Sequence, residues 1–241
     1  MVRLPLFVVA LLVAGCAPSA ELQIPTPDRP LAHGRLVVVP VGPAAAEGSV
    51  GTGSGAAYQQ AGFESAEAHE AAFWATFVGA LGRELDGFEV VLGARVDSAA
   101  FADRRALVQG VQGGFGRERW TVETVRVPTL VDFAALQADH VLYLRDLQMA
   151  TDAGDHVAVL GLAFGLAGAA IGAAIPAKGV GIGADVVLMS ATETSPLLAM
   201  RMGGIGEGEG LLGRRINRDV WDQAVGQLAR GVAARTNGRS E

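Results

Sequence analysis

The chain has 241 residues, half of them hydrophobic, and a formal net charge of −6 at pH 7. This length suits a single domain with a full hydrophobic core. The negative charge disfavours nucleic acid and anionic membrane surfaces as partners, because both repel an acidic protein. Cys16 is the only cysteine, which excludes an intrachain disulfide.

The N-terminus has the features of an export signal. Arg3 precedes the apolar run Leu4–Val13, and two small residues separate this run from Cys16. The run is shorter than the about 20 residues that a membrane-spanning helix needs. Residues 13–16, V-A-G-C, resemble the lipobox of bacterial lipoproteins. The resemblance implies removal of residues 1–15, lipidation of Cys16 and, because Ala17 follows rather than aspartate, an outer-membrane location facing the periplasm. The alternative is a plain signal peptide with an unmodified cysteine.

Residues 16–34 contain four prolines among small and polar residues. Prolines at this density favour an extended tether between the lipid and the domain. The alternative is a terminal arm that packs on the domain. In either case we expect one folded domain over residues 35–241.

The beginning of this domain predicts a strand, a helix and a second strand. The run Arg35–Val41 (RLVVVPV) is typical of a strand buried on both faces. After a glycine-rich loop over residues 42–64, Glu67–Asp86 places apolar residues at steps of three and four, which predicts a helix capped by Ser65. Phe88–Leu92 (FEVVL) predicts a strand parallel to the first.

The following residues predict a second helix and a loop. Asp97 is a candidate cap for a helix that extends to about Gln109. Residues 110–128 are rich in glycine and arginine and predict mostly loop. A capping box at Thr129 predicts a short helix over Leu130–Gln137.

The rest of the domain predicts strands and a closing helix. A strand begins near Ala138 and continues toward Ala150, and Gly183–Ala191 with Leu197–Gly203 predicts a pair of strands joined by a turn. Residues 204–210 (GIGEGEG) predict a flexible connector. Arg218–Arg235 then predicts an amphipathic helix, with Asn217 as its cap and Trp221 on its apolar face.

The strand that begins A-D-H-V-L-Y-L at Ala138 carries a family resemblance. The phrase and the order of elements around it resemble a periplasmic domain shared by several bacterial lipoproteins. Its relatives include the curli secretion lipoprotein and the amino-terminal domain of the Tol translocation β-propeller protein. Ser190–Ser195 lacks the Asp-x-x-x-Gly turn usual in that group. The resemblance implies an α/β fold, with a mixed sheet of about five strands flanked by helices, and binding or assembly roles without catalytic residues.

Residues 157–177 form a glycine-rich, apolar helical insertion in this pattern. Its glycines recur at steps of four, three and four, so they share one helical face to which another helix can approach closely. These are Gly161, Gly165, Gly168 and Gly172. The length also suffices to cross a bilayer core. Three interpretations stay open: a helix packed on the domain, a membrane-inserted segment and an oligomer interface.

A basic and aromatic cluster is the candidate partner-binding site. It consists of Arg117, Arg119 and Trp120. Guanidinium groups pair with a carboxylate or phosphate in a bidentate manner and stack on indole rings. The alternative is a loop whose tryptophan packs into the core.

The sequence offers little for catalysis or metal binding. Asp152, Asp155 and His156 have donor atoms suited to a metal, but D-A-G-D is also typical of a turn. No nucleophile elbow or H-E-x-x-H pattern occurs. We therefore expect a non-enzymatic outer-membrane lipoprotein, without cofactor or metal, that binds or scaffolds envelope proteins. The alternative is a membrane-inserting oligomeric secretion or assembly subunit that uses residues 157–177.

Overall fold

The computed structural model describes residues 22–24, 31–42, 62–112, 117–150, 179–207 and 217–238. The predicted signal peptide, Cys16, and the insertion over residues 157–177 with its four glycines lie outside the described residues. So do the candidate metal ligands at positions 152, 155 and 156. Among the helices that are described, none is long and apolar enough to cross a membrane.

A mixed five-stranded sheet with the order β3-β2-β6-β7-β8 forms the centre of the fold. Strand β2 (Gly34–Pro40) pairs in parallel with β3 (Phe88–Leu92) and with β6 (His140–Ala150). Strands β7 (Gly179–Ser190) and β8 (Leu198–Glu207) continue the sheet in antiparallel pairs. The predicted α/β class, the sheet of about five strands and the parallel first pair are confirmed.

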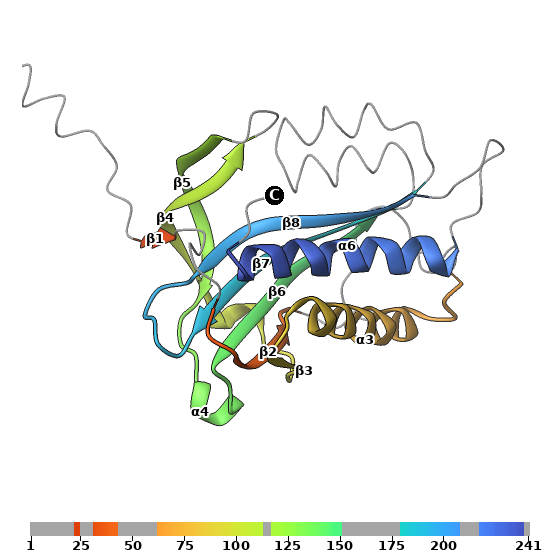
Figure 1. The fold of residues 1–241 in the computed structure, drawn as a ribbon, viewed down its shortest axis with the longest axis horizontal. Coiled ribbons are helices and arrows are strands. Elements are labelled where there is room, and N and C mark those ends of the chain that lie inside the picture. The colour runs from red at the N-terminus through yellow and green to blue at the C-terminus, as the bar shows by residue number, and fades with distance from the viewer. Residues whose placement is uncertain are drawn as a thin grey trace, which may run out of the picture.

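Two helices cover one face of this sheet. Figure 1 shows α3 (Ala66–Glu84) and α6 (Arg218–Thr236) side by side across the strands. Both predicted caps are present, because the side chains of Ser65 and Asn217 accept hydrogen bonds from backbone N–H groups three residues further along. Each cap satisfies a donor that the first helical turn leaves unpaired.

The central sheet is buried on both faces, as the RLVVVPV run predicts. Leu36 and Val38 of β2 lie beneath the helices in one core with Phe77 and Trp221, all four at most 1% exposed. The alternate valines of the same strand belong to a second core on the opposite face. Successive side chains of a strand point to opposite faces, so one strand contributes to both cores.

A three-stranded sheet with the order β1-β4-β5 packs on that opposite face (Figure 1). It consists of β1 (Leu22–Ile24), β4 (Phe101–Gln112) and β5 (Arg117–Pro128). Phe101 and Tyr143 join the two sheets, with ring centroids 5.2 Å apart in an edge-to-face contact.

This second sheet overturns two predictions. The helix predicted after Asp97 is a single 3-10 turn, Ser98–Ala100, followed by β4, and the loop predicted over residues 110–128 contains β5. The two strands pair over twelve positions, and a long ladder with one buried face outweighs weak local preferences. Ala106 and Val108 show the resulting period of two, since both are buried.

The N-terminal segment also differs from an extended tether. Leu22–Ile24 pairs in parallel with β4, and Ile24 is only 1% exposed. For these residues the alternative, an arm packed on the domain, is correct. An apolar side chain that fills a gap between two sheets outweighs the preference of neighbouring prolines for solvated chain.

Two shorter elements differ at their boundaries. Helix α4 spans only Phe133–Leu136, and its cap is Asp132 rather than Thr129. The predicted connector begins inside β8, whose residues Gly204 and Gly206 lie directly against the backbone of α6. Glycine there permits a close approach of helix and strand, which is a packing role.

Candidate functional site

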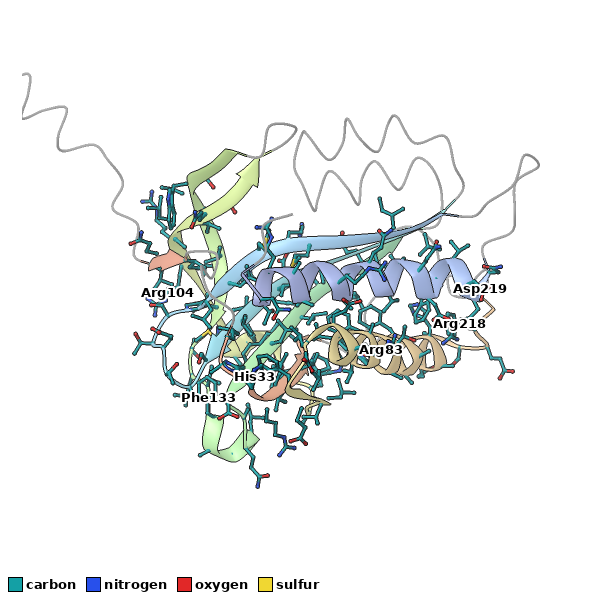
Figure 2. The ribbon with its side chains drawn as sticks, in the orientation of Figure 1. His33, Arg83, Arg104, Phe133, Arg218 and Asp219 are labelled. Carbon is teal, nitrogen blue, oxygen red and sulfur yellow. The ribbon has the colours of Figure 1, made fainter. Side chains whose placement is uncertain are left out.

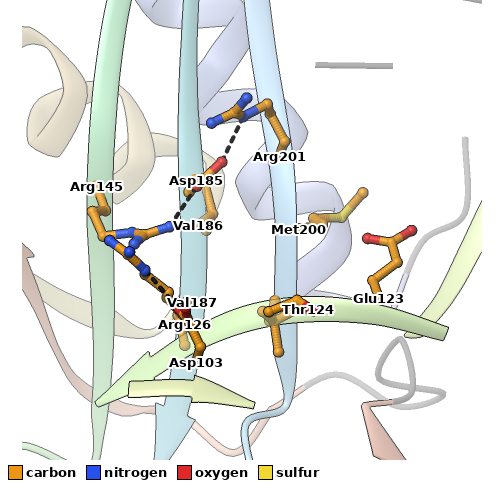
Figure 3. A pocket seen from close by; sticks show the side chains of 12 residues that line it. Asp103, Glu123, Thr124, Arg126, Arg145, Asp185, Val186, Val187, Met200 and Arg201 are labelled. Carbon is orange, nitrogen blue, oxygen red and sulfur yellow. Dashed lines mark hydrogen bonds and ion pairs between the residues drawn. The ribbon is translucent and has the colours of Figure 1, made fainter. Parts of the chain in front are cut away.

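An ionic row crosses the central sheet on the face that the second sheet covers. Arg145 of β6, Asp185 of β7 and Arg201 of β8 are direct cross-strand neighbours. The carboxylate of Asp185 accepts from both arginines, with 2.7 Å to Arg145 Nη2 and 2.6 Å to Arg201 Nε (Figure 3). Each oxygen of Asp185 accepts from a different guanidinium group, so the two hydrogen bonds fix the orientation of all three side chains.

The row lies where the apolar core between the sheets ends. Two residues away on the same face, the equivalent cross-strand row consists of Tyr143, Val187 and Ala199, all buried. The strands therefore carry apolar residues where the second sheet packs closely and charged residues where the two sheets leave a space.

A β-bulge shapes the site at Arg145. The β6–β7 register shifts between Arg145 and Gln148, and Asp146 has a φ of 50°, a left-handed conformation uncommon for residues other than glycine. Bulges re-aim side chains and occur often beside functional sites. Here the bulge brings the Asp146 carboxylate to 3.1 Å from Arg145 Nη2.

Arg145 is buried but only partly satisfied. The residue is 8% exposed, and both of its ion pairs use Nη2. Its Nε and Nη1 atoms have no hydrogen-bond partner within the described part of the chain. An unpaired buried donor costs about 1–3 kcal/mol, so this guanidinium group keeps unused capacity for an acceptor.

A cavity of about 460 Å³ lies over the row, between the two sheets. Its lining includes residues 123–126 of β5, Asp103 of β4 and the three residues of the row. Figure 3 shows Arg126 and Asp103 on the side of the second sheet, joined at 2.6 Å. The hydrogen bond to Asp103 raises the pKa of Arg126, and the more distant charges of Asp146 and Asp185 act in the same direction.

The site consists of paired arginines and carboxylates, with donor atoms left over on Arg145. Arginines and carboxylates that already pair with one another offer directional donors and acceptors to a polar ligand. Among the described residues no group of three or more histidine, cysteine, aspartate or glutamate side chains is suited to a metal ion. His140 has a structural contact, because its Nε2 lies 3.1 Å from the backbone oxygen of Ala32.

A second polar cluster lies at the N-terminal ends of the two helices. The indole N–H of Trp221 donates to Nε2 of buried His69 over 2.9 Å. Burial, and then the charge of Arg218, lowers the pKa of His69 to about 4. The guanidinium group of Arg218 lies 4.4 Å from the ring centre of Phe63 and 4.7 Å from that of Trp221. This cluster stabilises the helix pair through cation–π contacts.

The predicted partner-binding residues, Arg117, Arg119 and Trp120, all lie on β5. Trp120 is 39% exposed, so the alternative in which it packs into the core is wrong. The cavity is lined by a later part of the same strand, which the sequence did not single out. The pattern that could have indicated the cavity is a single charged residue within an apolar strand, as with Arg145 in LYLRDL and Asp185 in GADVVL.

Comparisons with known proteins add one similar structure. No family model matches the chain, and no curated protein matches it. The crystal structure of protein XCC0632 from Xanthomonas campestris, described with the family model DUF330, aligns with 90% of this chain and 92% of its own. The identity is 10% and the TM-score 0.41. At that level of similarity, no residue role or function is transferred from one chain to the other.

Proposed function

We propose that this chain is a non-catalytic lipoprotein, anchored through Cys16 at the outer membrane and facing the periplasm, that binds other proteins of the cell envelope. The observation that carries the proposal is the V-A-G-C tetrad after a short apolar run. The run is too short to span a bilayer, as in an export signal, and the two small residues and the chain's only cysteine that follow it favour lipidation over a plain signal.

The cavity between the sheets supports the binding role. It combines buried Arg145, whose Nε and Nη1 have no partner among the described residues, with ion pairs whose geometry is fixed by three neighbouring strands. A preorganised site of this kind binds a polar group of a partner with little loss of side-chain entropy. The described site residues are arginines and carboxylates that pair with one another, which favours binding over catalysis.

Anchoring is tested by Cys16→Ala in cells. We expect the variant to leave the membrane fraction or to remain unprocessed, because the lipid is attached to the thiol. Ala17→Asp is the matched control, since it keeps the thiol and is expected to remain lipidated but to shift to the inner membrane. A Cys16→Ala protein that is normally processed and still carries lipid would contradict the proposal.

Partner binding is tested by photocrosslinking in living cells. A photoreactive residue at Thr124, on the cavity wall, should capture specific envelope proteins, which mass spectrometry identifies. The control position is Arg83, which is exposed on α3 in the helical layer (Figure 2). Identical products from both positions, or none from Thr124, would argue against a binding role for the cavity.

The alternative, a membrane-inserting oligomeric subunit, rests on the glycine spacing within residues 157–177. Size exclusion of the detergent-extracted protein separates the two functions. A large ring-sized oligomer would favour the alternative, and a monomer or dimer would favour the anchored binding protein.

A further inference from the structure

The outer edge of β5 is the longest strand edge that no other described strand pairs with. Within the described strands, β5 pairs only with β4 and is twelve residues long. The corresponding edge of β8 is partly covered, because the side chain of Gln227 in α6 accepts from the N–H of Ile205 over 2.9 Å. A long open edge is a template for another strand.

This edge also carries exposed apolar side chains. Trp120 is 39% exposed and Val122 is 45% exposed, and they lie two positions apart on one face of β5. They are two of the four large hydrophobic residues that are exposed in the described structure. Apolar side chains beside an open strand edge indicate a surface that a partner covers.

The sequence of the edge indicates what that partner is. From Arg119 to Glu123 the side chains are positive, apolar, polar, apolar and negative, centred on Thr121. We propose that the β5 edges of two copies pair in antiparallel orientation about a two-fold axis at Thr121. Trp120 of each copy then lies opposite Val122 of the other, and Arg119 lies opposite Glu123.

Neighbouring registers lose this complementarity. An axis at Trp120 places Val122 opposite the charged Glu118. An axis at Val122 places Trp120 opposite the polar Thr124. Only the axis at Thr121 matches apolar residues with apolar ones and opposite charges with each other, which are the favourable cross-strand pairs.

A hydrogen bond within β5 orients the side chain of Glu123. The hydroxyl of Thr121 donates to the carboxylate of Glu123 over 3.0 Å, which holds the carboxylate along the strand. Each cross-strand pair contributes about 0.2–1 kcal/mol, and a single strand pairing buries less surface than a standard stable interface. The expected product is therefore a weak, reversible dimer that joins two three-stranded sheets into one of six strands. The proposal does not depend on the lipid anchor.

Disulfide trapping of the full-length protein, extracted in detergent, tests the register. Opposite residues in an antiparallel pair have Cβ atoms about 4.5–5.5 Å apart, close to the separation in a disulfide. Thr121→Cys should therefore give a disulfide-linked dimer on mild oxidation. Glu123→Cys is the matched control, because the two copies of this position would be offset by four residues, about 13 Å. The Arg119→Cys/Glu123→Cys double variant should again crosslink.

Charge reversal provides a second measurement. Arg119→Glu and Glu123→Arg should each weaken dimerisation about tenfold in analytical ultracentrifugation, because two like-charged pairs replace two ion pairs. The double reversal should restore the parent affinity. Equal crosslinking of the cysteine variants at positions 121 and 123, or a double reversal no better than either single one, would overturn the proposal. A folded Thr121→Cys protein that fails to crosslink would do the same.

Discussion

Gly206 of β8 supports the contact between the central sheet and α6. A Cβ atom built on Gly206 would overlap the backbone carbonyl of Val220, with its carbon only 2.7 Å away. Gly204 has the same relation to the next turn of the helix, where a Cβ would lie 2.6 Å from the backbone nitrogen of Leu228. Both obstacles are backbone atoms, which cannot rotate aside as a flexible side chain can. Gly206→Ala therefore forces the helix to move away from the strand.

The cost follows from what that movement disturbs. Helix α6 buries Trp221, Val225, Leu228 and Val232 completely. Overpacking of a well-packed core costs about 1–3 kcal/mol. A clash with backbone atoms, which only a shift of the whole helix relieves, belongs at the upper end of that range. We expect Gly206→Ala to lower the free energy of unfolding by about 3 kcal/mol. For a chain of this size this corresponds to a fall in Tm of roughly 6–12 °C.

Urea unfolding followed by circular dichroism measures the effect, with Gly226→Ala as the control. Gly226 lies in α6 with only Arg230 Nη1 near its added Cβ, at 3.6 Å. That substitution should stabilise the protein by about 0.5–1 kcal/mol, because alanine favours helix more than glycine does. The two changes are chemically identical and opposite in expected sign. A Gly206→Ala protein as stable as the parent would refute the close-approach argument.

Three further predictions concern the buried core and its polar groups. The pKa of His69 is about 4 in the folded protein against an ordinary value of 6.5, so protonation favours the unfolded state. Stability should fall by up to about 3 kcal/mol as the pH drops from 6.5 toward 4, and His69→Gln should lose this dependence in unfolding curves measured across that range. Phe77→Ala and Trp221→Ala should each cost about 3–5 kcal/mol in urea unfolding, and an unchanged midpoint would contradict their burial. Arg145→Ala should cost about 3 kcal/mol, because it breaks a buried ion pair. Arg201→Ala should cost at most about 1 kcal/mol, because its side chain is 29% exposed, and equal losses would contradict the assigned burial.

Local pattern was sufficient where one signal was strong and continuous. The RLVVVPV run predicted a strand buried on both faces, and β2 contributes to both cores. The apolar spacing of the first and last helices, with Ser65 and Asn217 as caps, predicted elements that the structure confirms within about two residues at each end. These signals depend on the periodicity of one segment and on hydrogen bonds within it.

The wrong predictions share a cause. Strand β4 contains two arginines and a glycine, and the three arginines of β5 drew attention away from its tryptophan, valines and threonines, which favour a strand. The pairing of the two strands with each other stabilises both. Gly204 and Gly206 of β8 were predicted to belong to a flexible connector. Their role is to let β8 approach the backbone of α6, and that helix begins only at Arg218. The candidate site was missed for the same reason. Arg145, Asp185 and Arg201 are isolated charges within apolar strands, and only the β6–β7–β8 register makes them neighbours.

By itself, the sequence determined the α/β class, the main strands and helices, and the residues that point to lipid anchoring, because these depend on patterns a few residues long. The tertiary structure decided that residues 22–24 pack on the domain, that a second sheet covers the central one, and that an ionic row lies in the space between them. Each of these depends on pairings between residues far apart in the chain, as when Leu22 aligns with Ala106 and Arg145 aligns with Asp185. The local sequence around a residue does not indicate which distant residue will lie opposite it, so these pairings can be identified only in the assembled sheets.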